Sequence, residues 1–206
     1  IENKKILDIG CNDGSLLDIF KKQGAITIGI EPTNAYLDAK EKGHFTYNNY
    51  LSQTLTNNIL KEHGDIDIIT FTNVFAHIED LREVLLSIKK LMSKNTILVI
   101  ENHYLGSVLD GNQFDTFYHE HPRTYSYRSF VHIANSLNSS IFDVQFPSRY
   151  GGNIRVFITQ NSVKNKTPDI NELKLKENKF HEQFIKLNQN INHWRINKKA
   201  ILKKQI

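Results

Sequence analysis

The chain has 206 residues, of which 39% are hydrophobic and 23% charged. This length predicts one domain with a short extra element, and this composition excludes wholesale disorder. A single cysteine excludes a disulfide framework and a cysteine-based zinc site within the chain. No apolar run approaches the length of a membrane span and no signal peptide is visible, so we expect a cytoplasmic protein with no membrane partner.

Charge is unevenly distributed along the chain. The net charge is +4, but residues 161–206 carry eleven Lys or Arg and four acids, a net +7 that leaves −3 for residues 1–160. A nucleic-acid partner is therefore not indicated for the main part of the chain. The first residue, Ile1, lies close to a buried strand pattern, and the last residues continue a helical pattern. We therefore expect a piece of a longer protein with missing flanking domains.

Short apolar runs typical of buried strands alternate with segments of helical spacing. The strand runs are residues 5–10, 26–31, 66–72 and 96–101. The helical segments are residues 14–23, 34–42 and 81–92. Strands that are apolar on both faces and separated by helices predict a parallel sheet covered on two sides. The fold class is therefore α/β, doubly wound and Rossmann-like.

The second half of the chain departs from this alternation. Residues 102–128 are rich in His, Tyr, Phe and Asp with little periodicity, as expected of an insertion that contacts substrate. Residues 129–137 have helical spacing, and residues 140–145 and 153–159 predict a closing antiparallel hairpin. Residues 161–168 read as a linker.

A long basic helix is predicted towards the end of the chain. Its apolar residues recur at spacings of 4, 3, 4 and 3: Phe180, Phe184, Leu187, Ile191 and Trp194. Such a stripe indicates docking against a missing domain or a partner, and a nucleic-acid or membrane role is the alternative. The predicted division is a domain over 1–160, followed by a linker and helical extension over 161–206 that leads into a truncated C-terminal domain.

A glycine-containing loop is the sharpest local signal. The run DIGCNDG, residues 8–14, follows a strand and opens a helix, and Gly10 and Gly14 allow a tight turn near a ligand. Glu31 ends the next strand, where an acid can accept hydrogen bonds from two ribose hydroxyls. A nicotinamide dinucleotide and a chance turn are the alternatives. Asp8 and Asp13 would repel a pyrophosphate but suit the ammonium and sulfonium groups of S-adenosylmethionine.

The loop resembles motif I of the class I S-adenosylmethionine-dependent methyltransferases, with Asn12 replacing the second glycine of the dinucleotide-binding pattern, and this resemblance implies a seven-stranded sheet. By that resemblance, a set of residues would contact the cofactor. They are Asp8, Gly10, Asn12, Asp13, Gly14, Glu31, Pro32, Tyr50, Leu51, Asn73 and Val74. Tyr50 and Leu51 fall where the adenine is flanked, and Asn73 and Val74 beside the methionine end.

Ionisable side chains collect after the strands. Tyr118, His119, Glu120 and His121 are consecutive, while His77 follows the strand run at 66–72 and His103 the run at 96–101. Parallel strands end at one sheet edge, so these groups could converge as a base with oxyanion partners. Incidental polar groups are the alternative. A metal site at residues 119–121 lacks the H-E-x-x-H spacing, and no metal is predicted.

Five segments in one order extend the resemblance over about residues 5–160. They are DIGCNDG (8–14), FAHI (75–78), ENHYLG (101–106), FDTFYHEH (114–121) and GGNIRVF (151–157). Together they resemble the sugar C-methyltransferases that act on nucleotide-linked 4-keto-deoxysugars. The resemblance implies a base that removes the proton next to the ketone, so that the enolate carbon attacks the methyl group.

The same resemblance assigns roles to individual residues. His121 would be the base, Glu120 its partner or a ligand of a sugar hydroxyl, and His77 and Tyr118 would stabilise the enolate oxygen or shuttle protons. Arginines at 123, 128, 149 and 155 are candidates for diphosphate contacts. Zinc is expected only in a missing N-terminal cysteine module. O- or N-methylation of another small molecule or glycan, and a non-catalytic cofactor-binding scaffold, remain the alternatives.

Overall fold

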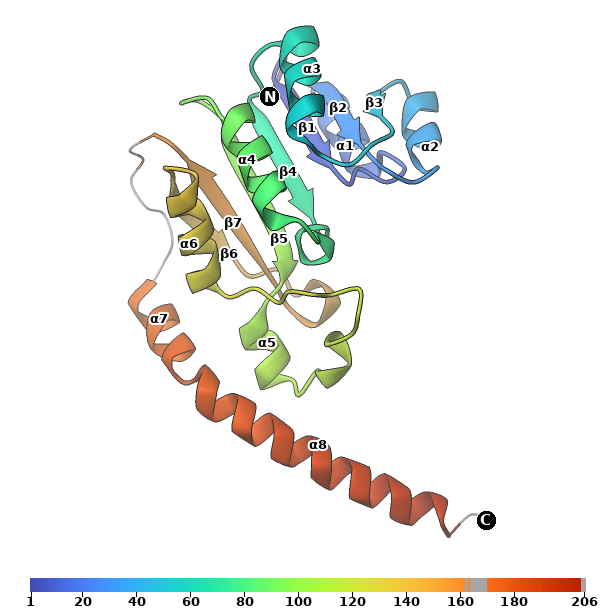
Figure 1. The fold of residues 1–206 in the computed structure, drawn as a ribbon, viewed down its shortest axis with the longest axis vertical. Helices are drawn as coiled ribbons and strands as arrows, with labels where there is room; N and C mark the ends of the chain where they lie inside the picture. The colour runs from blue at the N-terminus through green and yellow to red at the C-terminus, as the bar shows by residue number, and fades with distance from the viewer. Residues whose placement is uncertain (162, 164–169, 205–206) are drawn as a thin grey trace.

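The computed structural model describes residues 1–161, 163 and 170–204. Seven strands form one sheet in the order β3-β2-β1-β4-β5-β7-β6 (Figure 1). The strands are β1 (Lys5–Ile9), β2 (Ile26–Ile30), β3 (Phe45–Tyr47), β4 (Ile68–Thr72), β5 (Ile97–His103), β6 (Ser140–Gln145) and β7 (Asn153–Thr159). All neighbours pair in parallel except β5 with β7 and β6 with β7, which confirms the doubly wound fold and the closing hairpin.

Eight α-helices and three short 3₁₀ helices connect the strands within the described residues. The α-helices are α1 (Ser15–Lys21), α2 (Tyr36–Glu41), α3 (Gln53–His63), α4 (Leu81–Leu91), α5 (Leu105–Asp110), α6 (Tyr127–Ser136), α7 (Ile170–Asn178) and α8 (Phe180–Leu202). The 3₁₀ helices are η1 (Phe75–His77), η2 (Phe114–Thr116) and η3 (Arg149–Gly151). Strand β3 and helices α3 and α5 were not expected from the sequence. Most of the expected linker, residues 162 and 164–168, lies outside the described residues.

Helices α3, α4 and α6 lie over one face of the sheet (Figure 1) and bury the larger core. Helix α4 shows why the sequence folds this way, because its apolar positions recur on one side and bury Ile88 and Leu91. Its first turn is fixed by Asp80, whose carboxylate accepts from the backbone N–H of Glu83 at 3.0 Å. A second, small core of Cys11, Leu17 and Ala39 joins the glycine loop to α1 and α2.

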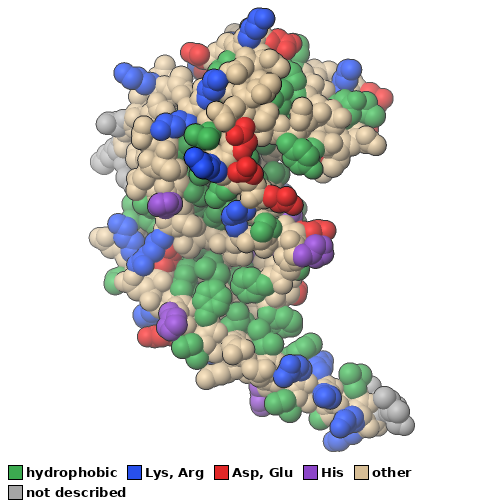
Figure 2. Space-filling model, in the orientation of Figure 1, with side chains coloured by type: hydrophobic (Ala, Val, Ile, Leu, Met, Phe, Trp, Pro, Cys, Tyr) green, Lys and Arg blue, Asp and Glu red, His purple; other side chains and the backbone are tan. Residues whose placement is uncertain are grey.

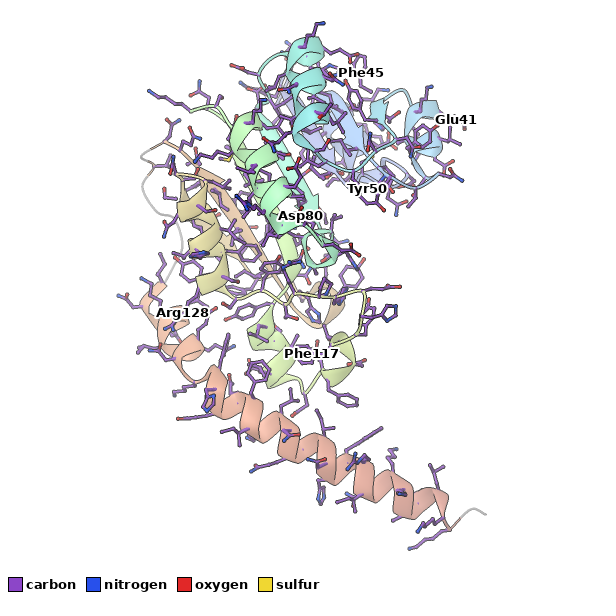
Figure 3. The ribbon with its side chains drawn as sticks, viewed as in Figure 1. Glu41, Phe45, Tyr50, Asp80, Phe117 and Arg128 are labelled. Carbon is purple, nitrogen blue, oxygen red and sulfur yellow. The ribbon has the colours of Figure 1, made fainter. Side chains whose placement is uncertain are left out.

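The C-terminal helices pack on the rest of the chain. Leu187 of α8 is buried, and the ring of Phe117 lies 6.4 Å from that of Phe184 while Phe114 lies 5.5 Å from Trp194. Figure 2 shows hydrophobic side chains gathered where α8 joins the domain, and Figure 3 shows Phe117 in the segment above that helix. This part of the stripe therefore contacts the chain's own insertion, whereas the sequence indicated a missing domain or partner.

One buried carboxylate joins α7 to α6. Glu177 is only 4% exposed and accepts hydrogen bonds from the backbone N–H groups of Tyr127 and Arg128, at 2.7 and 3.1 Å. These are the first N–H groups of α6, which have no partner inside the helix. The hydroxyl of Tyr104 donates to the same carboxylate at 3.2 Å. Glu177 thus caps a helix that lies some fifty residues earlier in the sequence.

Candidate active site

The glycine loop after β1 takes an unusual backbone path. Gly10, Asn12 and Gly14 all have positive φ, at 74°, 51° and 78°. The N–H groups of Gly10 and Cys11 both donate to the carbonyl of Ile30, at 2.8 and 3.1 Å, which draws the loop against the end of β2. A Cβ on Gly10 would lie 2.4 Å from the side chain of Val74, so this position requires glycine.

Glu31 stands at the end of β2, and its carboxylate faces this loop. The two oxygens accept from the backbone N–H groups of Asn12 at 3.0 Å and Thr33 at 2.9 Å. Glu31 is buried, and through these two hydrogen bonds it holds the loop in place. Each carboxylate oxygen can accept a further hydrogen bond, which leaves the geometry compatible with the expected ribose contact.

Asp8 is the most perturbed acid of the loop. Burial raises its pKa from 3.8 to about 7, against the lowering effect of the Thr70 hydroxyl, which donates to the carboxylate at 2.6 Å. The charge of nearby Glu31 raises this pKa further. The ionised carboxylate therefore lacks a compensating positive charge, and a cationic ligand at the loop would supply one.

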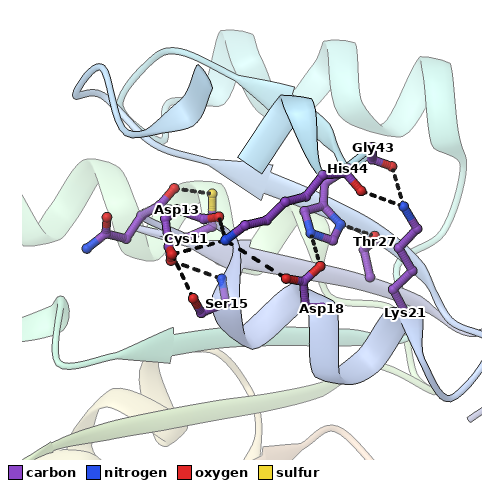
Figure 4. A network of polar contacts seen from close by, with 10 residues as sticks. Cys11, Asp13, Ser15, Asp18, Lys21, Thr27, Gly43 and His44 are labelled. Carbon is purple, nitrogen blue, oxygen red and sulfur yellow. Dashed lines mark hydrogen bonds and ion pairs between the residues drawn. The ribbon is translucent and has the colours of Figure 1, made fainter. Parts of the chain in front are cut away.

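Asp13 is not placed as the sequence suggested. Its carboxylate accepts from the hydroxyl and N–H of Ser15, at 2.7 and 3.0 Å, and forms an ion pair with Lys42 at 3.0 Å (Figure 4). The Ser15 hydrogen bonds and Lys42 together lower the pKa of Asp13 to about 2. Since Lys42 already compensates this charge, the expected repulsion of a pyrophosphate rests on Asp8.

The remaining expected cofactor residues lie at different depths. Leu51 is buried, Pro32 half-buried, and Tyr50 is 76% exposed on the loop after β3 (Figure 3). Asn73 has a φ of 56° at the end of β4, and its side-chain oxygen accepts from Asn153 at 3.0 Å. Val74 packs on Gly10. These residues therefore follow the carboxyl ends of β2, β3 and β4, and Tyr50 is the one among them that is strongly exposed.

A hollow of about 750 Å³ begins at the loop and runs along the sheet. Asp8, Gly10 and Asn12 line one end, and side chains of α1, β4, β5 and β7 line the rest. This volume accommodates a ligand of cofactor size. Its walls are mainly apolar, and the buried acid at the loop end suits a ligand that carries positive charge. The loop end of this hollow fits the cationic end of S-adenosylmethionine, whereas Glu31, Leu51 and Asn73 do not line it.

A smaller hollow of about 210 Å³ contains the expected catalytic histidines. The rings of His77 and His121 lie 4.6 Å apart, and the Tyr118 hydroxyl lies 3.2 Å from Nε2 of His121. Nδ1 of His121 lies 3.2 Å from the carbonyl of Thr116. A carbonyl can only accept, so Nδ1 carries the proton and Nε2 keeps its lone pair. Burial lowers the pKa of His121, which favours this neutral form.

Glu120 does not face His121 as the resemblance implied. Its backbone carbonyl accepts from Nδ1 of His77 at 2.8 Å, while its carboxylate is exposed and lies 3.8 Å from the exposed His119. The group that orients His121 is instead the carbonyl of Thr116, which no sequence pattern indicated. Within the described residues, no cluster of three or more metal-ligating side chains occurs.

The four arginine candidates have different partners. Arg155 pairs with the buried Glu101 at 2.6 Å, and Arg123 donates to the backbone carbonyls of residues 78 and 79. Arg128 contacts α7, beside which Figure 3 places it. Of the four, only Arg149 both lines the larger hollow and has neither an ion pair with a carboxylate nor a hydrogen bond to a backbone carbonyl among the described residues. Its guanidinium carbon lies 5.6 Å from the centre of the Tyr150 ring.

A network of asparagines at the carboxyl ends of β4 and β5 was not anticipated from the sequence. Asn153 begins β7, and its side-chain nitrogen donates to Asn73 at 3.0 Å and to the buried carboxylate of Glu101 at 2.8 Å. Asn102 and Asn153 both line the smaller hollow. The only signal in the sequence was their position at strand ends, because amides carry no charge pattern that marks a site.

Comparison with known proteins identifies the family of the chain. The family model described as a methyltransferase domain matches residues 1–141. The chain therefore belongs to the methyltransferase-domain family. It is an S-adenosylmethionine-dependent methyltransferase domain, with that compound as its cofactor.

Two curated relatives indicate the range of reactions. The C-methyltransferase NovU of Streptomyces niveus is 30% identical over 153 residues, which are 74% of this chain and 36% of the relative. The ubiquinone biosynthesis O-methyltransferase of Pasteurella multocida is 30% identical over 110 residues, or 48% of this chain and 46% of the relative. The matched segments thus span less than half the length of these relatives.

Solved structures show the same fold at low sequence identity. Magnesium protoporphyrin IX methyltransferase from Synechocystis PCC 6803, with bound SAH, superposes with a TM-score of 0.58 at 16% identity, covering 78% of this chain and 75% of that one. A SAM-dependent methyltransferase from Archaeoglobus fulgidus gives a TM-score of 0.58 at 15% identity, covering 76% and 86%. No helix of the described residues combines the length and apolarity needed to cross a membrane.

Proposed function

We propose that this domain transfers a methyl group to a carbon atom beside the ketone of a nucleotide-linked deoxysugar. The single observation that carries the proposal is the neutral His121 at the smaller hollow, whose Nε2 accepts from the Tyr118 hydroxyl and whose ring lies 4.6 Å from that of His77. Transfer to carbon needs a base, because a C–H group has no lone pair. The similarity to NovU supports the same reaction class.

The residues of the smaller hollow have distinct roles in this proposal. Nε2 of His121 takes the proton next to the ketone, and the electron pair of the broken C–H bond moves into an enolate. The Tyr118 hydroxyl, which rests on Nε2 in the free protein, then donates to the enolate oxygen. His77 holds the insertion in place through its hydrogen bond to the Glu120 carbonyl. Bound S-adenosylmethionine supplies the electrophilic methyl group.

The cofactor is held by the loop and its neighbours. Backbone at Gly10 and Asn12 approaches it closely, Asp8 offers a negative charge to its cationic end, and Glu31 accepts from its ribose. Asn73, Val74, Pro32 and Leu51 flank it in this proposal. Because Asp13 already pairs with Lys42, its role is to fix the loop rather than to contact the cofactor.

The test uses the whole protein that carries this chain. It is incubated with S-adenosylmethionine and nucleotide-linked 4-keto-sugars that carry deuterium beside the ketone. Mass spectrometry follows the gain of one methyl group and the loss of deuterium. Methylation with loss of label is expected, and His121→Ala should abolish both without changing cofactor affinity. His132→Ala, at an exposed histidine of α6, is the matched control.

Other outcomes favour the other reactions. Methylation that retains the deuterium would contradict the enolate step and favour O-methylation, the reaction named for the ubiquinone relatives. Tight cofactor binding without methylation of any offered acceptor would exclude the keto-sugar proposal and favour a different acceptor or a cofactor-binding scaffold.

A further inference from the structure

His103 is a third histidine at the smaller hollow. It is the last residue of β5 and lines the hollow together with His77 and His121. Its Nε2 is buried and has no hydrogen-bond partner among the described residues. A buried polar atom without a partner is costly, so such an atom at a hollow indicates a contact with a ligand.

Gln113 acts on the ring of His103 from the neighbouring segment. Burial lowers the pKa of His103, and Gln113 opposes this with a smaller raising effect. The side-chain nitrogen of Gln113 donates to the carbonyl of Gly151 at 3.0 Å, which leaves its oxygen for the imidazole. An amide oxygen can only accept, so Gln113 favours a ring N–H on the side that faces it.

The position of Gln113 is fixed by close packing. Gly151 has a φ of 82°, and a Cβ at this residue would lie 2.6 Å from the side-chain nitrogen of Gln113. Glycine is thus required for the backbone to approach the amide. The chain from Gly151 through Gln113 to His103 orients the imidazole before any ligand binds.

Two neighbouring atoms share the character of Nε2. The side-chain oxygens of Asn102 and Asn153 are also buried without a partner among the described residues, and both asparagines line the same hollow. The ends of β5 and β7 therefore hold three buried polar atoms that lack partners among the described residues, at residues 102, 103 and 153. A hydroxyl group can both donate and accept, so it can satisfy such atoms.

We propose that His103 is a specificity-determining residue of the methyl-acceptor site, where its Nε2 forms a hydrogen bond with a hydroxyl group of the acceptor. This inference rests on the proposed function of the smaller hollow. It narrows the acceptor to a sugar with a free hydroxyl near the carbon that is methylated. Gln113 is a positioning residue, because it acts through His103.

The test compares a nucleotide-linked keto-sugar with the analogue that lacks the hydroxyl. Calorimetry measures the binding of each to the protein saturated with S-adenosylhomocysteine, so methyl transfer is not required. The wild-type protein should bind the hydroxylated sugar about 10- to 100-fold more tightly. His103→Phe should remove this preference by weakening only the hydroxylated sugar. Gln113→Leu, which leaves His103 in place but removes the amide that acts on its ring, should reduce the preference several-fold.

The affinity for S-adenosylhomocysteine provides the control for folding and should not change in either variant. Equal weakening of both sugars would show that His103 is merely structural, and a change in the affinity for S-adenosylhomocysteine would place it in the cofactor site. Either result overturns this inference but not the proposed function. If no nucleotide-linked sugar binds the wild-type protein, both proposals are wrong.

Discussion

Replacing Asp8 with asparagine should stabilise the ligand-free protein at alkaline pH. The folded state raises the pKa of Asp8 from 3.8 to about 7, because burial disfavours the charged carboxylate. Between these two values the folded protein holds a proton that the unfolded chain has released. The stability associated with Asp8 is thus fully present below pH 3.8 and is lost as the pH rises through about 7.

The size of the effect follows from the two pKa values. A tenfold change in proton affinity corresponds to about 1.4 kcal/mol, so a pKa raised from 3.8 to about 7 corresponds to about 4 kcal/mol once the group is fully ionised. Asparagine keeps an oxygen to accept from Thr70, which donates to Asp8 at 2.6 Å, and removes the titration. For a chain of this size, the stabilisation would raise the melting temperature by roughly 8–16 °C.

The assay is urea unfolding of both proteins without cofactor, from about pH 5 to about pH 8. The advantage of Asp8→Asn should grow as the pH rises towards about 7 and level off above that value. Asp38→Asn, at an exposed acid of α2, is the control and should show no such trend. A stability difference that stays constant with pH would refute the reasoning. The same variant should bind S-adenosylmethionine at least about tenfold more weakly, since it loses the charge that faces the cationic end.

Three further predictions concern other parts of the chain. Glu177→Ala should destabilise the protein by about 3 kcal/mol, because three donors lose a buried carboxylate; urea unfolding beside the exposed Glu182→Ala checks this, and equal curves would contradict it. Gly10→Ala should lower the affinity for the cofactor at least about tenfold, as measured by calorimetry. The new Cβ would lie within 2.4 Å of the Val74 side chain, on a backbone with a φ of 74°. An unchanged affinity would argue against a tight cofactor loop. The rate of methyl transfer should fall with acidification only below pH 6.5, because burial lowers the pKa of His121 from that value; an acidic limb above it would exclude this base.

The strands that carry the site could be predicted because they are apolar on both faces. β1, β2, β4 and β5 have this pattern, and the loop after β1 begins a helix as expected. β3 was missed since it has three residues and lies at the sheet edge, where Phe45 is 54% exposed. α3 was missed because its sequence is polar, although Ser52 caps it by accepting from Leu55 N–H at 3.2 Å.

The site illustrates which contacts a linear pattern leaves undetermined. The sequence indicated that His77 and residues 118–121 share one sheet edge, and the structure brings their rings together. It could not indicate that Glu120 faces solvent, since neighbouring residues of an irregular loop have no fixed direction. It could not indicate the Asp13–Lys42 pair either, because that contact joins residues 29 positions apart.

The packing of α8 against the insertion bears on how acceptor preference can be exchanged between relatives. Residues 114 and 117 of the insertion touch residues 194 and 184 of the helix through their aromatic rings. A chimaera that receives only a foreign insertion would set unmatched rings against α8 and shift the neighbouring Tyr118 and His121. Transplanting the insertion together with residues 180–194 keeps both halves of this contact. The two segments are far apart in the sequence but should be exchanged together when chimaeras of related domains are made.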